Sequence, residues 1–370
     1  MSDSHQLELT ALNGANPLGF LAALGVVATL KGEARLSWRR GASWTPVLHG
    51  FEDQDQLCEH LVPKLRGQGI GPEAEALRKE AEKAFGKAKK TLKDKKEEIK
   101  KQKLPKEARE RAIEREVRPI EQEFEQARAA HLCALKEAVP SPELALGQRP
   151  DCTAEEFRQN AETFVRDASQ EDRLAVDLLA AFGSDGAMTK ERITATPFCF
   201  ITGSGHQWFL DTARQLMTEV TAERIRLTLF EPWTYQDEKL SMRWDPLDDR
   251  RYALMDRDPT AADNKSKTVW MANLLAYRAL EFFTSAPARS GLQTTGWTRI
   301  NKSQCLTWPL WEDALTGSTI RSLLQLRELS EESPNQRLRD RGIKATFRCE
   351  RIQVGNPPLH KINFSPSRAV

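Results

Sequence analysis

A long charged stretch in the first half of the chain most constrains how this sequence can fold. From about Pro72 to Ala138 it is dominated by lysine, glutamate and alanine, which favour helices but supply few apolar side chains for a core. Pro105 divides the stretch, because proline lacks a backbone N–H and clashes with the preceding helical turn. We therefore expect an inserted, coiled-coil-like helical hairpin with a further disturbance at Pro119. Its predicted anchors are Leu77, Phe85, Leu92 and Ile99 on one arm, and Ile113, Ile120 and Phe124 on the other.

The sequence on both sides of the hairpin predicts a mixed α+β fold. A short strand is expected at 7–12 and a helix from Pro17 to about Lys31, because proline suits the first helical turn. Asn13 and Asn16 are suited to the helix entry, since their side chains can accept hydrogen bonds from free amides. Alternating apolar residues on either side of Gly41 predict a β-hairpin.

The second half of the chain repeats the strand–turn–helix pattern once. A strand at 196–202 is expected to enter a small-residue turn and a helix at 208–220. Further helices are predicted at 155–168, 173–182 and 264–284, and strands in "GLQTTGW", "CLTWPLW" and near the C-terminus. We divide the chain into an N-terminal α+β part (1–71), the hairpin (72–138), an α+β core (139–330) and a basic C-terminal strand and tail (331–370).

Composition argues against several classes of protein. No apolar run reaches the roughly 18 to 20 residues of a membrane helix, so we expect a cytoplasmic protein with no membrane partner. The six cysteines are scattered singly, without a CxxC pair or a histidine at metal-ligand spacing. We therefore expect no metal site, no disulfide framework and no cofactor.

Several phrases of the sequence, in their order, resemble a known family. They are "LTALNGANPLGFLAALGVV", "TPFCFITGSGHQWFLDTARQL", "RWDPLDDRRYALMDRDPT", "TVWMANLLAYRALEFFTSAP", "LQTTGW" and "LTWPLWEDAL". The family is the large subunit of type I-G (formerly I-U) CRISPR effector complexes, of the Cascade kind. The resemblance covers about 7–49 and 195–329, and does not cover the charged hairpin.

The resemblance implies a function in antiviral defence. Such a chain would be a non-catalytic subunit of a crRNA-guided surveillance complex that engages the protospacer-adjacent motif and stabilises the R-loop. Its implied partners are the crRNA-bound backbone subunits, target double-stranded DNA and the helicase-nuclease. No residue is assigned a role by the resemblance.

Two glycine-containing turns raise the question of phosphate binding. In "NGANPLG" the spacing of Gly14 and Gly19 matches a phosphate-binding loop, but Phe20 stands where that motif requires lysine. A packed corner is the favoured interpretation, with phosphate contact by helix-start amides as the alternative. In "TGSGHQ", Ser204 and His206 could belong to an anion-binding nest or to a plain turn.

An acidic cluster supports an enzymatic alternative. Asp245, Asp248 and Asp249 could bind a metal ion for nuclease chemistry. Arg250 and Arg251 follow them directly and would neutralise the field that a metal requires, so loop ion pairs are favoured.

Basic segments are the main indication of nucleic-acid binding. Residues 83–111 contain 13 Lys/Arg against 5 Asp/Glu, and 337–370 contain 8 against 2, whereas the whole chain has a net charge of only +2. Clustered cations neutralise phosphates and release counterions, although a solvated surface or a docking role for the hairpin remains an alternative. The predicted nucleic-acid-binding residues are Asn13, Asn16, Lys89, Lys90, Lys93, Lys190, Arg192, Ser204, His206, Arg250, Arg251, Lys265, Lys267, Arg299, Lys302, Arg348 and Arg351.

Overall fold

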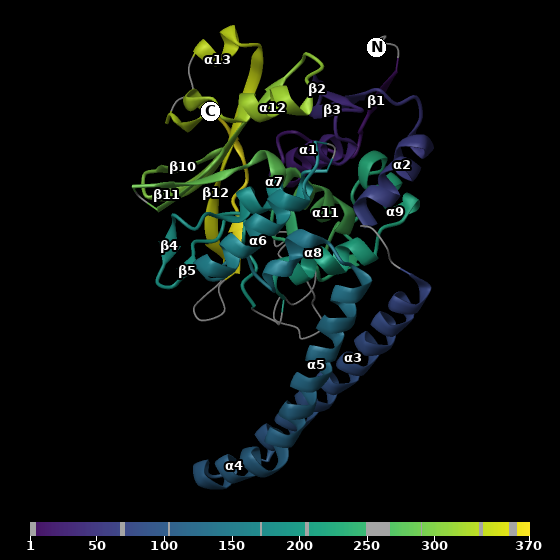
Figure 1. Ribbon diagram of the computed structural model, residues 1–370, viewed down its shortest axis with the longest axis vertical. Helices are drawn as coiled ribbons and strands as arrows, with labels where there is room; N and C mark the ends of the chain where they lie inside the picture. The colour runs from purple at the N-terminus through teal and green to yellow at the C-terminus, as the bar shows by residue number, and fades with distance from the viewer. Residues whose placement is uncertain are drawn as a thin grey trace. The chain divides into compact units, whose positions relative to one another are not determined.

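The computed structural model divides the chain into two compact units (Figure 1). Unit 1 comprises Met1–Arg66 and Pro142–Val370, and unit 2 comprises Gly67–Ser141. Both helices and strands are present, which confirms the predicted α+β class. Within the described part of the chain no helix is long and apolar enough to cross a membrane. The structure describes residues 5–66, 71–102, 104–170, 172–203, 207–248, 267–289, 291–332, 336–354 and 361–370.

Two apolar helices form the centre of unit 1. Helix α1 (Pro17–Leu30) is buried along its whole length and packs against α11 (Trp270–Arg278). A Cβ atom at Gly25 would lie 1.8 Å from the backbone oxygen of Leu275. Only glycine therefore allows the two helices to approach this closely.

The described part of unit 1 contains further α-helices. They are α2 (Gln54–Arg66), α6 (Ala154–Asp167), α7 (Leu174–Phe182), α8 (Phe209–Thr218), α9 (Ala222–Phe230), α12 (Gly317–Leu324) and α13 (Gln336–Asp340). Single 3-10 turns lie at Pro142–Leu146, Ala279–Phe282 and Arg327–Ser330.

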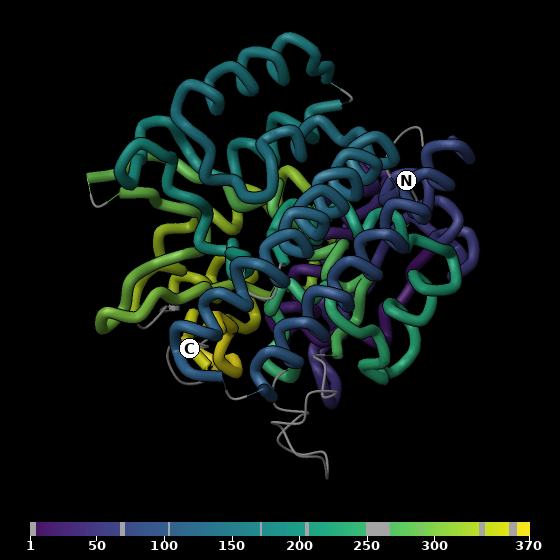
Figure 2. The backbone as a smooth tube through the Cα atoms, turned by 90° about the horizontal axis from the view of Figure 1, so that it is seen from below, coloured from purple at the N-terminus to yellow at the C-terminus, as the bar shows by residue number. Residues whose placement is uncertain are grey.

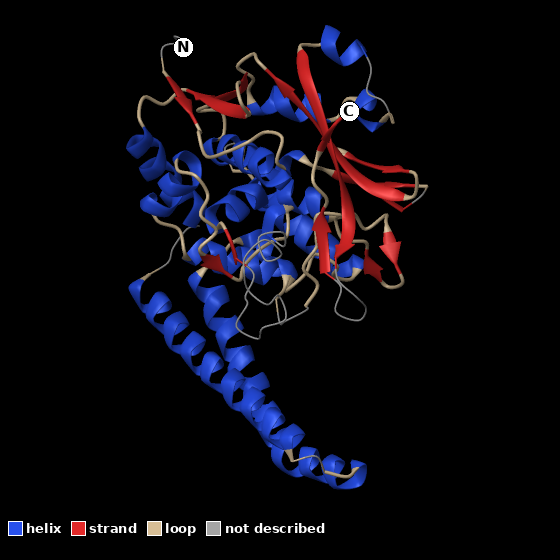
Figure 3. Ribbon diagram, turned by 180° about the vertical axis from the view of Figure 1, so that it is seen from behind, coloured by secondary structure: helices blue, strands red, loops and turns tan. Residues whose placement is uncertain are grey.

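The larger sheet of unit 1 is antiparallel and lies beside the helices (Figure 3). Its order is β10 (Trp297–Ile300), β11 (Ser303–Trp311), β12 (Ile343–Val354) and β13 (Lys361–Phe364), and β14 (Arg368–Ala369) also pairs with β12. A three-stranded sheet has the order β1 (Gln6–Glu8), β3 (Trp44–His49), β2 (Arg35–Arg40). Three two-stranded pairs are β4 (Met188–Thr189) with β5 (Arg192–Ile193), β6 (Asp237–Glu238) with β7 (Lys267–Thr268), and β8 (Ser285–Ala288) with β9 (Gly291–Thr294).

The "NGANPLG" segment is a packed corner between α1 and the strands β2 and β11. A Cβ atom at Gly14 would lie 2.6 Å from the ring of Trp38, and the indole N–H of Trp308 donates to the Gly14 oxygen at 2.8 Å. At the end of the corner, Asn16 caps α1 by accepting from the backbone N–H of Gly19. The Trp38 ring therefore occupies the space beside Gly14 that a phosphate would need. The sequence pointed to the same conclusion, because the motif lacks its lysine.

Unit 2 is a helical hairpin. Its helices are α3 (Pro72–Lys101), α4 (Lys106–Ala112) and α5 (Arg118–Ala138), with a π-helical segment at Ile113–Val117. Figure 2 shows α3 and α5 running side by side. The π-helical segment immediately precedes Arg118–Pro119, where the proline has no N–H for the helical ladder.

Stacked rings and ion pairs hold the two arms together. Phe85 of α3 packs between Phe124 and His131 of α5, with ring centroids 5.5 and 5.3 Å apart. Lys95 forms an ion pair with Glu116 at 2.8 Å across the hairpin. The predicted anchors Leu77 and Ile113 are instead exposed large apolar residues.

Two predicted elements are wrong. Residues 196–202 form a loop rather than a strand, and their apolar side chains Phe198 and Phe200 both pack in the core against Trp297. The helix predicted from Asn264 begins only at Trp270, because Lys267 and Thr268 belong to β7.

Candidate nucleic-acid interface

A row of polar side chains crosses three neighbouring strands of the larger sheet. Arg299 on β10 is the registered partner of Gln304 on β11. The Nη1 of Arg351, on β12, donates to Oε1 of Gln304 at 3.3 Å. Strand pairing therefore brings two arginines, which are distant in sequence, to the same face of the sheet.

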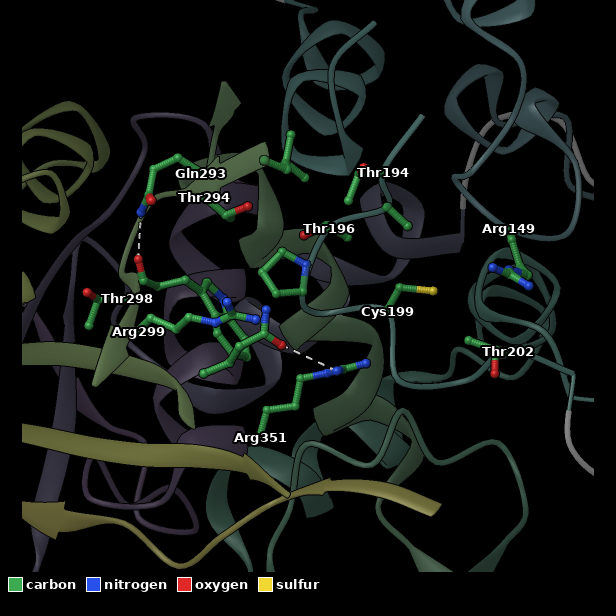
Figure 4. A pocket seen from close by; sticks show the side chains of 15 residues that line it. Arg149, Thr194, Thr196, Cys199, Thr202, Gln293, Thr294, Thr298, Arg299 and Arg351 are labelled. Atoms are coloured by element: carbon green, nitrogen blue, oxygen red, sulfur yellow. Dashed lines mark hydrogen bonds between the residues drawn. The ribbon is translucent and has the colours of Figure 1, made fainter. Parts of the chain in front are cut away.

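This row forms one wall of a cavity of about 410 Å³ (Figure 4). Other walls come from the loop at 194–202, from β9 and β10, and from Arg149. In Figure 4, Arg149 lies near Cys199 and Thr202, away from Arg299. The cavity thus collects three arginines from separate parts of unit 1.

No carboxylate from the described part of the chain lines this cavity. Arg149 forms an ion pair with Asp151 at 2.5 Å, but Arg299 and Arg351 have no carboxylate within ion-pair distance among the described residues. Burial lowers the pKa of the Arg351 guanidinium, which stacks over the ring of Phe200 at 5.4 Å. A partly buried cation without a counterion is costly, so this wall is suited to an anionic ligand.

Four buried polar atoms around the cavity have no hydrogen-bond partner among the described protein atoms. They are Nε of Arg149, Oγ1 of Thr196, Nε1 of Trp297 and Nε of Arg351. Trp297 and Thr196 are only 5 % and 3 % exposed. Because buried donors are nearly always paired, their concentration here indicates a place for a ligand rich in acceptors.

Two hairpin tips carry further cations on the same side of unit 1 (Figures 1 and 3). Lys190 lies in the turn between β4 and β5, and Lys302 in the turn between β10 and β11; both are exposed, with positive φ. Arg192 on β5 is also exposed, but its Nε donates to the backbone oxygen of Asp151. The structure therefore brings the predicted residues Lys190, Arg192, Arg299, Lys302 and Arg351 into one region.

Arg348 is a correction to the predicted interface. It is 1 % exposed and donates to Oγ1 of Thr307 at 2.8 Å and to the backbone oxygens of Glu331 and Glu332. A side chain that is buried and hydrogen-bonded in this way holds β12 to its neighbours and cannot reach a nucleic acid.

The predicted asparagines have structural roles. Oδ1 of Asn13 accepts from the backbone N–H of Ala15 at 2.9 Å. Besides capping α1, Asn16 donates from Nδ2 to Oδ1 of Asp245 at 3.0 Å. Both polar atoms of the Asn16 amide therefore have partners within the protein, which gives Asn16 a structural role in holding the start of α1.

Of the remaining predicted residues, those that the structure describes do not line the cavity. Lys267 lies in β7 and is half-buried. In unit 2, Lys89 and Lys90 are exposed on α3, and Lys93 pairs with Glu97 at 3.8 Å. Ser204, His206, Arg250, Arg251 and Lys265 lie outside the described residues.

The two described aspartates of the alternative nuclease site are buried hydrogen-bond acceptors. Asp245 accepts from the hydroxyl of Tyr235 at 2.6 Å, and Asp248 accepts from the hydroxyls of Ser241 and Thr268. Across the described ranges, no group of three or more His, Cys, Asp or Glu residues is placed to hold a metal ion. Asp249 lies outside those ranges.

Sequence reasoning missed Arg149 and Thr196. Arg149 stands alone between Gln148 and Pro150, and Thr196 lies in a segment interpreted as a strand. Neither has a local pattern that would have found it, because only the tertiary fold brings them to the cavity.

Comparison with known proteins finds no matching protein-family model, no matching curated protein and no matching solved structure.

Proposed function

We propose that this chain is a DNA-binding large subunit of a type I crRNA-guided surveillance complex. It would engage the protospacer-adjacent motif, stabilise the R-loop and help to recruit the helicase-nuclease, without cutting DNA itself. The sequence resemblance supplies this context, in which guide pairing reads the target sequence and the protein reads a short motif and the backbone.

The observation that carries the proposal is the cavity with three arginines, of which Arg299 and Arg351 have no carboxylate partner in the described ranges, beside two lysine-bearing hairpin tips. Nucleic-acid backbones are recognised by clustered Lys and Arg side chains that are not neutralised by nearby acids. Lys190 and Lys302 both project from tight turns, where a side chain can reach a phosphate outside the cavity.

A non-catalytic role is supported by the environment of the acidic cluster. Asp245 is fully buried, and its oxygens accept from Asn16, Tyr235 and the Leu247 backbone. A carboxylate committed in this way connects α1 to the segment before Asp248 and is not available to a magnesium ion.

The test is the salt dependence of duplex DNA binding by the assembled complex. We expect the double variant Lys190→Glu/Lys302→Glu to weaken binding and to reduce the slope of log K against log salt by about 2, since each phosphate contact contributes about 0.9. The matched control is Arg40→Glu, which reverses an exposed cation at the end of β2, in the β2–β3 hairpin.

Two results would contradict the proposal. One is a double variant that binds with the same affinity and salt slope as the unmodified complex. The other is a complex lacking this subunit that still distinguishes duplexes with and without the motif.

A further inference from the structure

We propose that the cavity between β10, β12 and the 194–202 loop binds one nucleotide of a single strand, turned away from its neighbours. The phosphate would lie at Arg299 and Arg351, and the base or sugar would accept hydrogen bonds from Trp297 and Thr196. This inference rests on the proposed function and names the ligand of its central site.

First, the walls of the cavity carry unpaired hydrogen-bond donors. The Nε atoms of Arg149 and Arg351 and the indole Nε1 of Trp297 are donors only, and the Thr196 hydroxyl can donate as well. A ligand that satisfies them must present several acceptors in a small volume. A nucleotide does so, because phosphate, sugar and base all carry acceptor oxygens or nitrogens.

Second, the positive charge lies on the same wall of the cavity as Trp297. Arg299 and Trp297 lie two residues apart on β10 and therefore on the same face of the strand. Gln304 connects Arg299 to Arg351 through strand pairing and a hydrogen bond at 3.3 Å. An anionic group at the arginines thus leaves the remainder of the ligand beside the indole N–H.

Third, the cavity has the size of a small-molecule site. A volume of about 410 Å³ lies toward the lower end of the roughly 300–1,000 Å³ of small-molecule sites. A nucleic-acid duplex cannot enter such a space, whereas a base removed from its stack can enter a pocket of this kind. The occupant is therefore a single nucleotide unit, either from a displaced DNA strand or from RNA.

Fourth, the unpaired donors form no hydrogen bonds to described residues that would stabilise the fold. Trp311 lies in the same sheet, and its indole N–H donates to the Leu36 oxygen at 2.8 Å. The indole N–H of Trp297 has no such partner among the described atoms, although its ring packs on Phe198 and Phe364 at 5.2 and 5.7 Å. The ring of Trp297 serves the core, and its N–H is left for a ligand.

The test uses the purified full chain and calorimetric titration with adenosine 5′-monophosphate, its 2′-deoxy form, adenosine and inorganic phosphate. We expect both mononucleotides to bind more tightly than adenosine or phosphate, and the tighter of the two will identify the strand that supplies the nucleotide. Thr196→Val, Trp297→Phe and Arg351→Gln should each weaken mononucleotide binding by about tenfold.

Trp311→Phe is the matched control. It makes the same chemical change as Trp297→Phe, but it breaks a buried hydrogen bond, so it should lower the melting temperature and leave mononucleotide affinity unchanged. Trp297→Phe should weaken mononucleotide binding and should lower the melting temperature less than Trp311→Phe does, because it reduces ring contacts but breaks no hydrogen bond that the structure describes. The two conservative variants keep the test valid even if Arg351→Gln fails to fold.

Mononucleotides that bind no better than phosphate or adenosine would overturn the inference, as would affinities that are equal in the three cavity variants and the unmodified chain. If the complex still binds duplex DNA with motif dependence in either case, the proposed function stands and only the nucleotide site is rejected. If DNA binding is absent as well, both fail.

Discussion

Two arginines of the same strand have opposite environments. Arg348 and Arg351 lie three positions apart on β12 and therefore face opposite sides of the sheet. Arg348 is surrounded by oxygen acceptors in the core, whereas Arg351 faces the cavity with an unpaired Nε. The basic composition of the C-terminal segment could not distinguish them, since that choice depends on which elements cover each face.

At Glu281 a single carboxyl group makes stability depend on pH. Burial raises its pKa to about 7, although Arg278 and Arg321 act in the opposite direction. A folded-state pKa above the unfolded value of 4.5 means that the folded state retains its proton between these values. The contribution of Glu281 to the free energy of unfolding is therefore full below about pH 4.5. It falls as pH rises and is lost once the pH has passed through 7, a change of about 3 kcal/mol.

Glu281→Gln should remove this contribution to the pH dependence. We expect the melting temperature of the unmodified chain to fall, relative to the variant, between pH 5 and 8, because the glutamine stays neutral. Thermal unfolding across this range measures the difference. Glu312→Gln, at an exposed ion pair with Lys344, is the control; an equal effect in both variants would contradict the role of Glu281.

At the scale of elements, the α3–α5 hairpin depends on a neutral histidine. His131 stacks on Phe85 with ring planes 6° apart, and burial lowers its pKa from 6.5. As pH falls below 6.5, His131 is therefore protonated in the unfolded chain before it is protonated in the folded hairpin. Proton binding then favours the unfolded state, so the hairpin loses stability in acid. His131→Phe keeps the ring contact and removes the proton.

Hydrogen exchange of the α3 and α5 amides is the appropriate measurement for this element. Protection in the unmodified chain should fall between pH 7 and 5.5, after correction for the intrinsic exchange rate, and should change less in His131→Phe. A control, His60→Phe, alters a half-exposed histidine of unit 1 that contacts Glu33. Unchanged protection of the hairpin at pH 5.5 would show that His131 does not titrate there.

Elements with a strong local pattern were predictable from the sequence. Helix α1, the β2–β3 hairpin and the break at Pro105 follow from proline position and apolar periodicity. The 196–202 segment was not predictable, because its apolar side chains have the composition of a strand and pack as a core loop. The same distinction applies to the cavity. Arg299 was predicted from the basic residues near it in the sequence, whereas the position of Arg149 at the cavity is evident only from the tertiary fold.

On the scale of the whole molecule, the division into two units makes the role of the hairpin testable by deletion. Replacing 67–141 with a flexible glycine–serine linker removes unit 2 and leaves the helices and sheets of unit 1. We expect the shortened chain to fold with a similar melting temperature, because the core residues around α1 and α11 all belong to unit 1. Failure to fold would show that unit 1 depends on the hairpin.

A subtler variant separates DNA contact from docking. Lys83, Lys87 and Lys90 follow helical i, i+4, i+7 spacing and are exposed on α3, and none has an ion-pair partner among the described residues. Changing all three to glutamine keeps the Phe85 seam intact. If this face contacts phosphates, the salt slope of DNA binding by the complex should fall by about 3. An unchanged slope would show that these lysines do not contact phosphates. If deletion of 67–141 also prevents assembly of the complex, unit 2 is instead a docking element for partner subunits, because assembly then depends on the hairpin and not on its lysines.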